Sequence, residues 1–180
     1  AGRLGTALEG AALDAAVKRE MGAKLEHVEA RIGAAVDAAP PMIAEMSRYI
    51  LCSGGKRLRP LLLLLTARMT GYRGELDEEY ALIYEFLHSA TLVHDDIIDE
   101  ADTRRGRPSV HAQWGRTQTV LLGDHVFTTG MDRAIAAGNV EIMRLISQTV
   151  LQLIEGELAQ LQRRFDLTLT MDEHLEILRK

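Results

Sequence analysis

Cysteine is nearly absent from this chain, since Cys52 is the one thiol among 180 residues. A lone cysteine excludes a disulfide within the chain, and it cannot supply the paired thiolates of a structural zinc site. A small secreted fold held by disulfides is therefore excluded, and we expect a protein of the cytoplasm.

Other absences narrow the class further. Aromatic residues make up 4% of the chain and prolines number 4, whereas alanine and leucine abound, which favours helices over sheets. No apolar run approaches the roughly 20 residues that a membrane-spanning helix needs. An excess of cations is also missing, because 21 Lys and Arg against 26 Asp and Glu give a net charge of −5. General nucleic-acid binding depends on clustered cations, so we exclude a nucleic-acid partner.

Apolar residues recur at helical spacing along most of the chain. A stripe from Val17 to Val36 predicts a long amphipathic helix that Pro40-Pro41 ends. A second helix is expected from there to Gly54-Gly55, and further helices over about 56–70, 77–100, 117–137 and 140–164. Thr170 or Asp172 could cap a last one. The chain is therefore predicted to be all-α, a single helical domain over residues 1–180 packed as a bundle.

Two details of this pattern can be checked against a structure. In the helix over 56–70, the residues expected to be buried are Leu58, Leu61, Leu62, Leu65 and Met69. The stretch 103–108 is basic and contains glycine and proline, which is typical of a loop.

Three aspartates crowd the end of the helix expected over 77–100. Asp95 and Asp99 lie one turn apart on one face, and Asp96 lies about 100° round the helix from Asp95. Their repulsion adds to the negative partial charge of a helix C-terminus, so a nearby cation would stabilise them. Mg²⁺ commonly takes one or two carboxylates together with waters and substrate phosphate oxygens. A Mg²⁺-diphosphate site is one interpretation, and a solvated acidic helix end is the other.

Two basic segments could hold an anion beside these aspartates. Residues 104–108 read RRGRP, and guanidinium groups match phosphate oxygens in two-pronged hydrogen bonds. Residues 54–60 read GGKRLRP and place cations at a helix start, where free N–H groups also favour an anion. The alternatives are a surface loop that neutralises the nearby acids and a capping loop with solvated cations. His88 lies two turns before Asp95 on nearly the same face, although a satisfied, half-buried histidine is the simpler interpretation.

Taken together, these motifs resemble the trans-isoprenyl diphosphate synthases, also called polyprenyl synthetases. The matching stretches are GGKRLRP at 54–60, FLHSATLVHDDIIDEADTRRGRPSVH at 86–111, VLLGDHVF at 120–127 and EGELAQL at 155–161. They cover most of residues 45–165. The resemblance implies an isoprenoid-synthase-type helical bundle around a central cavity. It also implies a homodimer, which is usual in the family.

The resemblance also implies roles for particular residues. Side chains that would hold the diphosphate of isopentenyl diphosphate are Lys56, Arg59, His88 and Arg105. Arg104 would contact the allylic diphosphate. The carboxylates assigned to Mg²⁺ are Asp95 and Asp99, with Asp96 in support or as a ligand. The residues expected to be catalytic are Asp95, Asp99 and Lys56.

The implied reaction is the condensation of isopentenyl diphosphate with an allylic diphosphate. The allylic C–O bond ionises while Mg²⁺ and arginines stabilise the departing diphosphate, and the carbocation alkylates the isopentenyl double bond. Proton loss then leaves a trans-polyprenyl diphosphate that is one C5 unit longer. In the family, large side chains four or five positions before the first aspartate form the floor of the product pocket. Ala90 and Thr91 are small, which predicts a long product, and Leu87, Tyr84 or Phe86 is a candidate floor deeper in the pocket. The alternative is that Ala90 and Thr91 only let helices pack closely.

The chain departs from the family pattern in length. Family members carry a Lys-Thr motif and a second Asp-rich motif in a C-terminal half, so these 180 residues are expected to be the N-terminal half of a domain that is incomplete at its C-terminus. Two alternatives stay open. One is a non-catalytic or regulatory partner subunit of a prenyl synthase, and the other is a class I terpene cyclase, which would not need the isopentenyl site.

Overall fold

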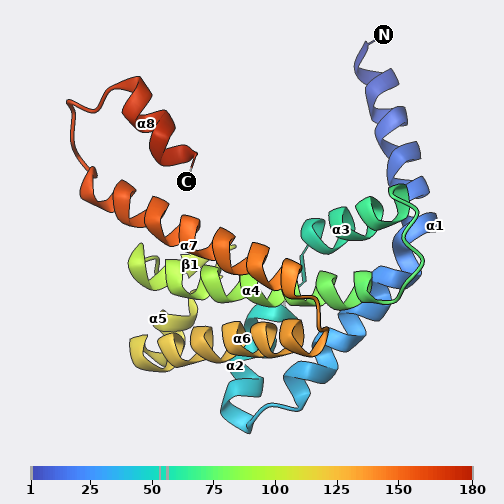
Figure 1. The fold of residues 1–180 in the computed structure, drawn as a ribbon, viewed down its shortest axis with the longest axis horizontal. Coiled ribbons are helices and arrows are strands. Elements are labelled where there is room, and N and C mark those ends of the chain that lie inside the picture. Colours follow the sequence, from blue (N-terminus) through green and yellow to red (C-terminus); the bar gives the residue numbers. More distant parts are fainter. Residues whose placement is uncertain (1, 53, 56, 180) are drawn as a thin grey trace. The chain divides into compact units, whose positions relative to one another are not determined.

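The computed structural model describes residues 2–52, 54–55 and 57–179; for residues 2–14 and Lys18 it describes the backbone alone. The chain divides into two compact units, Ala1–Ala137 and Gly138–Lys180, and each is treated by itself. Most of the described residues lie in helices, which confirms the all-α prediction (Figure 1). The expectation of a single domain that is incomplete at its C-terminus stays a prediction.

The first unit contains the longest helix of the described chain, α1, and one small hairpin. Its elements are α1 (Gly2–Asp37), α2 (Pro41–Leu51), α3 (Leu58–Met69), α4 (Leu76–Ile98), β1 (Thr103–Arg104), β2 (Arg107–Pro108), α5 (Val110–Trp114) and α6 (Arg116–Ala136). The second unit contains α7 (Val140–Gln162) and α8 (Met171–Leu178). The sequence pattern located α2, α3, α4, α6 and α7 to within a few residues and placed the start of α8. The stripe from Val17 covered only the later part of α1, which begins at Gly2. The pattern missed the short α5, whose single turn is too brief to show a periodic stripe.

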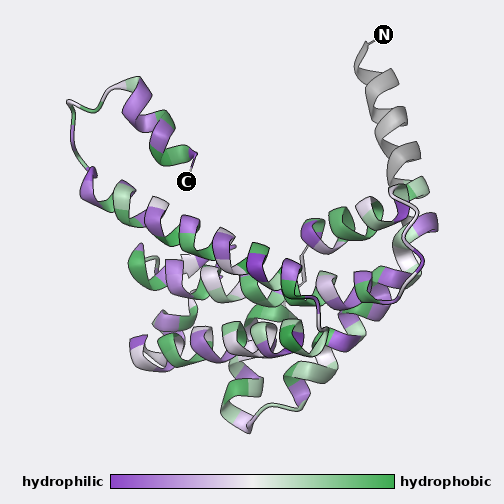
Figure 2. Cartoon of the chain, viewed as in Figure 1, coloured by the Kyte–Doolittle hydropathy of each residue, from purple (hydrophilic) through white to green (hydrophobic). Residues whose placement is uncertain are grey.

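Helix α4 is the centre of the first unit, since it packs against α6, α3 and α1. Along it, the apolar residues Leu82, Phe86, Ala90 and Val93 recur every three or four positions and are all buried. In Figure 2 apolar and polar residues alternate along the helices, as expected of amphipathic helices that share one core. The stripe of α1 is likewise buried, and its buried members are Met21, Val28, Ile32 and Val36.

Glycines let α4 and α6 approach each other closely. A Cβ atom on Gly130 would lie 3.2 Å from a methyl group of Leu87, and one on Gly123 would collide with the His94 ring. The His94 ring in turn lies 3.4 Å from the carbonyl oxygen of Val120. The absence of a side chain at Gly123 and Gly130 of α6 therefore allows the short distance between these two helices.

The expected buried face of α3 is wrong in three positions. Leu58, Leu62 and Met69 are exposed, whereas Leu64 is buried at 1% exposure. Leu61 and Leu65 are half-buried, as the pattern suggested in part. Residues 61–65 are all leucine, so apolar spacing there does not single out one face, and only the contacts of α3 with α4 and α1 decide it.

The segment predicted as a loop forms a tight hairpin. Thr103 pairs with Pro108, and Arg104 pairs with Arg107, in an antiparallel ladder. The two residues at the tip, Arg105 and Gly106, have φ values of 52° and 75°. Two positive φ angles in a two-residue connection are the mark of a type I′ turn, which explains why glycine stands at the second position.

In the second unit, each helix begins at a capping side chain. Asn139 accepts hydrogen bonds from the N–H groups of Glu141 and Ile142 at the start of α7. Thr170 and Glu173 form a reciprocal capping box at the start of α8, so Thr170 rather than Asp172 is the cap. Among the described residues of the whole chain, no helix is long and apolar enough to cross a membrane.

Candidate active site

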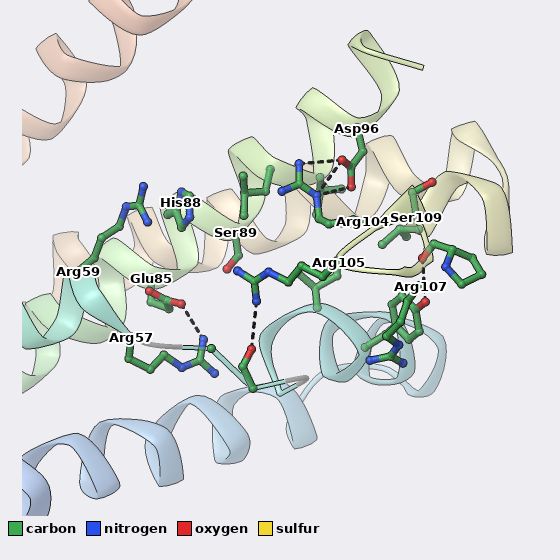
Figure 3. A pocket seen from close by; sticks show the side chains of 18 of the residues that line it. Arg57, Arg59, Glu85, His88, Ser89, Asp96, Arg104, Arg105, Arg107 and Ser109 are labelled. Carbon is green, nitrogen blue, oxygen red and sulfur yellow. Dashed lines mark hydrogen bonds and ion pairs between the residues drawn. The ribbon is translucent and has the colours of Figure 1, made fainter. Parts of the chain in front are cut away.

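A cavity of about 560 Å³ opens in the first unit between the end of α2, the start of α3, one face of α4 and the hairpin. It is rich in cations, because five arginines and one histidine line it against two carboxylates (Figure 3). The charged and titratable lining residues are Arg57, Arg59, Glu85, His88, Asp96, Arg104, Arg105 and Arg107. The structure thus brings both basic segments of the sequence to one place.

Helix α4 supplies one wall of this cavity. The residues involved are Glu85, His88, Ser89, Leu92, Val93 and Asp96. Steps of three and four residues keep them on one side of the helix. Of the three aspartates at the end of α4, Asp96 lines the cavity with His88, whereas Asp95 and Asp99 are not among its lining residues. The sequence spacing places His88 on nearly the same face as Asp95, and that placement stays a prediction.

Asp96 is buried at 3% exposure and is paired with Arg104. Arg104 Nε donates to both Asp96 carboxylate oxygens, at 2.8 and 2.9 Å, and Nη2 lies 2.7 Å from Oδ1. The hydrogen bond to Asp96 raises the pKa of Arg104, and the carboxylates of Asp95 and Asp99 raise it further. The pairing favours a supporting role for Asp96, and it matches the alternative in which an arginine neutralises the acids.

The other two aspartates are more accessible. Asp95 is half-buried in the last turn of α4, and Asp99 is the exposed residue that ends the helix. In the described part of the chain, no three His, Cys, Asp or Glu side chains converge closely enough to enclose a metal ion. Two hard oxygen donors one turn apart still fit Mg²⁺, which keeps most of its ligands as water or substrate oxygens.

Arg57 is a functional candidate that the sequence analysis left without a role. It adopts a left-handed conformation, φ 44°, at the start of α3. Its guanidinium lies 2.6 Å from Glu85 of α4 and also donates to Glu29 of α1 and to the Leu51 carbonyl oxygen. Burial opposes the charged form, but the hydrogen bonds to Glu29 and Glu85 raise the pKa of Arg57 above its usual value. Arg57 thus ties the basic segment 54–60 to two helices.

Arg105, Arg59 and His88 also face the cavity. Arg105 Nη1 donates to the carbonyl oxygen of Gly54 at 3.1 Å, so the hairpin touches the glycine segment. Figure 3 shows Arg59 near His88 on the same side of the cavity. Burial lowers the pKa of His88, and the positive charge of Arg59 lowers it further. A neutral imidazole beside cations can gain a proton when an anion arrives.

The other predicted site residues either do not line this cavity or lie outside the residues that the structure describes. Lys56 lies outside the described residues. Ala90 is buried in the core at 1% exposure, and Leu87 packs against Gly130 of α6. Thr91 is half-buried, and its hydroxyl donates to the carbonyl oxygen of His88 at 2.8 Å. None of Leu87, Ala90 and Thr91 lines the cavity, and their role in product length stays a prediction.

An arginine-lined cavity near an Asp-rich helix end, in a helical fold, has side chains suited to phosphate groups and a hard divalent cation. The family model described as polyprenyl synthetase matches residues 40–180. The chain belongs to the polyprenyl synthetase family, as the resemblance of its motifs indicated.

Curated relatives bear names of long-chain synthases. Octaprenyl diphosphate synthase of Escherichia coli strain K12 is 35% identical over 137 residues, which are 76% of this chain and 42% of that protein. Heptaprenyl diphosphate synthase component 2 of Geobacillus stearothermophilus is 33% identical over 156 residues, 87% of this chain and 49% of that protein. The chain therefore spans about half the length of the curated relatives it matches.

Solved structures agree with these relatives in fold. A decaprenyl diphosphate synthase from Rhodobacter capsulatus superposes with a TM-score of 0.84 at 34% identity, over 91% of this chain and 50% of that one. A polyprenyl synthase from Caulobacter crescentus CB15, complexed with calcium and isoprenyl diphosphate, gives a TM-score of 0.83 at 32% identity, over 89% of this chain and 49% of that one. The isoprenoid-synthase type of helical fold is thereby confirmed.

Proposed function

We propose that this chain carries the diphosphate-binding half of a trans-polyprenyl diphosphate synthase, a prenyltransferase of isoprenoid biosynthesis. The observation that carries the proposal is the cavity in which arginines of the segment 54–60 and of the hairpin face His88 and Asp96 of α4. The names of the relatives support the same activity. The comparisons favour neither a terpene cyclase nor a non-catalytic subunit.

The cationic residues would divide the two substrates between them. Residues proposed to hold isopentenyl diphosphate are Lys56, Arg59, His88 and Arg105. Arg104, oriented by Asp96, would reach the allylic diphosphate. Guanidinium groups fixed at the cavity wall favour the charge that develops on the departing diphosphate, so ionisation of the allylic C–O bond becomes easier.

Asp95 and Asp99 are the residues proposed to hold Mg²⁺. When bound, the ion would supply positive charge to the allylic diphosphate as it leaves. The Caulobacter structure, named as a complex with calcium and isoprenyl diphosphate, supports a divalent cation in this family. The allylic carbocation then alkylates the isopentenyl double bond, and loss of a proton completes the new C5 unit.

Isopentenyl diphosphate binding and turnover test this function. We expect the purified chain to bind isopentenyl diphosphate in calorimetry and Arg59→Gln to weaken that binding at least about tenfold, because a charge-assisted contact contributes roughly 1.5–3 kcal/mol. With Mg²⁺ and an allylic diphosphate, Asp95→Asn should abolish incorporation of labelled isopentenyl diphosphate. Asp132→Asn, on an exposed position of α6, is the matched control. Absence of isopentenyl diphosphate binding would overturn the proposal.

The product is proposed to be a long chain, beyond about C20, because Ala90 and Thr91 are small. Relatives named as octaprenyl and decaprenyl diphosphate synthases support this. Ala90→Phe and Thr91→Tyr are expected to shorten the product in an extension assay, with Leu87 as the next barrier. An unchanged product length in both variants would contradict the pocket assignment. A homodimer in the cytoplasm that delivers its product to a membrane completes the proposal.

A further inference from the structure

Tyr49 of α2 makes three different contacts at the base of the hairpin. Its hydroxyl donates to the Pro108 carbonyl oxygen at 2.8 Å. The Arg107 guanidinium lies over its ring, 4.2 Å from the centroid. Trp114 of α5 meets the ring edge to face, with centroids 5.0 Å apart and planes at 76°. One half-buried side chain thus connects α2, β2 and α5.

The tip of the same hairpin is connected back to α2. Arg105 donates to the carbonyl oxygen of Gly54, which follows the end of α2 by three residues. Tyr49 contacts the base of the hairpin and Arg105, at its tip, contacts Gly54, so α2, residues 54–55 and the hairpin form a closed ring of contacts. A two-stranded hairpin of this size is not stable alone and needs such attachments to keep one orientation.

Binding of an anion by Arg105 has a larger entropic cost when the hairpin that carries Arg105 is mobile. A long side chain on an unrestrained segment loses both backbone and side-chain freedom when it binds an anion. The contacts of Tyr49 restrict the hairpin before the ligand binds. Less conformational entropy is therefore lost on binding.

We propose that Tyr49 is a positioning residue that presents Arg105 to the substrate diphosphate together with the segment 54–60. This inference rests on the proposed function. Tyr49 acts through the hairpin and does not itself need to touch the ligand. The ring of contacts makes the two basic segments a single binding element, so loss of Tyr49 should weaken the anion contact made by Arg105.

Calorimetric titration with isopentenyl diphosphate tests the proposal. Tyr49→Leu removes the hydroxyl and the aromatic contacts, and we expect affinity to fall about tenfold, which corresponds to about 1.4 kcal/mol. Tyr49→Phe keeps the ring on Arg107 and Trp114 and loses one hydrogen bond, so a fall of about two- to fivefold is expected. Tyr72→Leu, at an exposed tyrosine away from the cavity, is the matched control and should bind as the wild type does.

A double-mutant cycle separates positioning from general destabilisation. If Tyr49 acts through Arg105, Tyr49→Leu should cost less than about twofold in an Arg105→Gln background, because the contact it supports is already gone. Equal costs in both backgrounds would overturn the proposal. Trp114 is the only tryptophan in the sequence, so its fluorescence emission reports its contact with Tyr49 directly. The emission should change in Tyr49→Leu without ligand.

The outcomes distinguish this inference from the proposed function. If the wild type does not bind isopentenyl diphosphate, both fail. If the wild type binds and Tyr49→Leu binds equally well, the function stands and the role of Tyr49 is refuted. A tenfold loss that disappears in the Arg105→Gln background supports both.

Discussion

At the scale of single residues, the Tyr80 hydroxyl stands out among the described side chains because it is buried without a hydrogen-bond partner. Burial also raises the pKa of Tyr80. An unsatisfied buried hydroxyl costs free energy, so Tyr80→Phe is predicted to raise the unfolding free energy by about 1 kcal/mol. Tyr49→Phe, which removes a hydroxyl that does donate, should lower it by a similar amount or less. Urea unfolding of both variants measures the difference, and a destabilised Tyr80→Phe would contradict it.

His88 makes a second residue-scale prediction, which concerns pH. Its pKa is lowered from 6.5, first by burial and then by Arg59, with Arg104 and Arg105 acting the same way and Glu85 opposing them. The unfolded chain therefore takes up a proton near pH 6.5 that the folded chain resists, so stability falls as the pH drops below that value and is unaffected above it.

His88→Gln should remove this part of the pH dependence. Melting temperatures at about pH 5.5 and 7.5 are expected to differ less in His88→Gln than in the wild type. His174→Gln, at an exposed position of α8, is the control for loss of a histidine as such. Identical pH profiles of the wild type and His88→Gln would show that the folded and unfolded pKa values of His88 coincide.

At the scale of elements, the contact of α4 with α6 depends on glycine. A Cβ on Gly130 would lie 3.2–3.4 Å from Leu87 and Phe86, so these neighbours must shift slightly to admit Gly130→Ala. Gly33→Ala in α1 is the matched control, because nothing lies within 4 Å of a Cβ there. Helix propensity alone favours alanine by about 1 kcal/mol, so Gly33→Ala should be stabilising and Gly130→Ala neutral or destabilising. Thermal unfolding that gives equal gains for both would contradict the close packing.

At the scale of the first unit, a row of charged pairs joins α1 to α4 and α6. Lys24 pairs with Asp77, His27 with Glu78, and Glu79 accepts from both Arg31 and Arg133. The Glu79 side chain is 15% exposed and those of both its arginines 30%, so water screens this cluster only in part.

Loss of the Glu79 charge leaves two partly buried arginines without their counter-ion. Glu79→Gln is predicted to lower the unfolding free energy by about 1–2 kcal/mol, since unpaired buried charge is costly. Glu100→Gln removes an exposed pair with Arg116, at side-chain exposures of 75% and 61%, and should change stability by less than about 1 kcal/mol. Urea unfolding at low and high salt measures both, and equal effects would show that the row is fully screened.

The sequence by itself determined the features that depend on the spacing of neighbouring residues. The stripe on α1 and the Asp-rich end of α4 follow from spacings of three and four residues. The family was likewise identifiable from short motifs, because residues 54–60 and 86–111 carry their chemistry in consecutive positions.

Only the tertiary structure decided which distant groups meet. Nothing local links Tyr49 to Pro108 or Arg57 to Glu85, since these pairs are 59 and 28 residues apart. The buried face of α3 and the pairing of Asp96 with Arg104 also could not be predicted from the sequence and became known only from the tertiary structure. Five consecutive leucines present apolar groups in every direction, and an arginine beside three aspartates can pair with any of them. Packing selects one partner because burial makes an unpaired charge or an exposed core face costly.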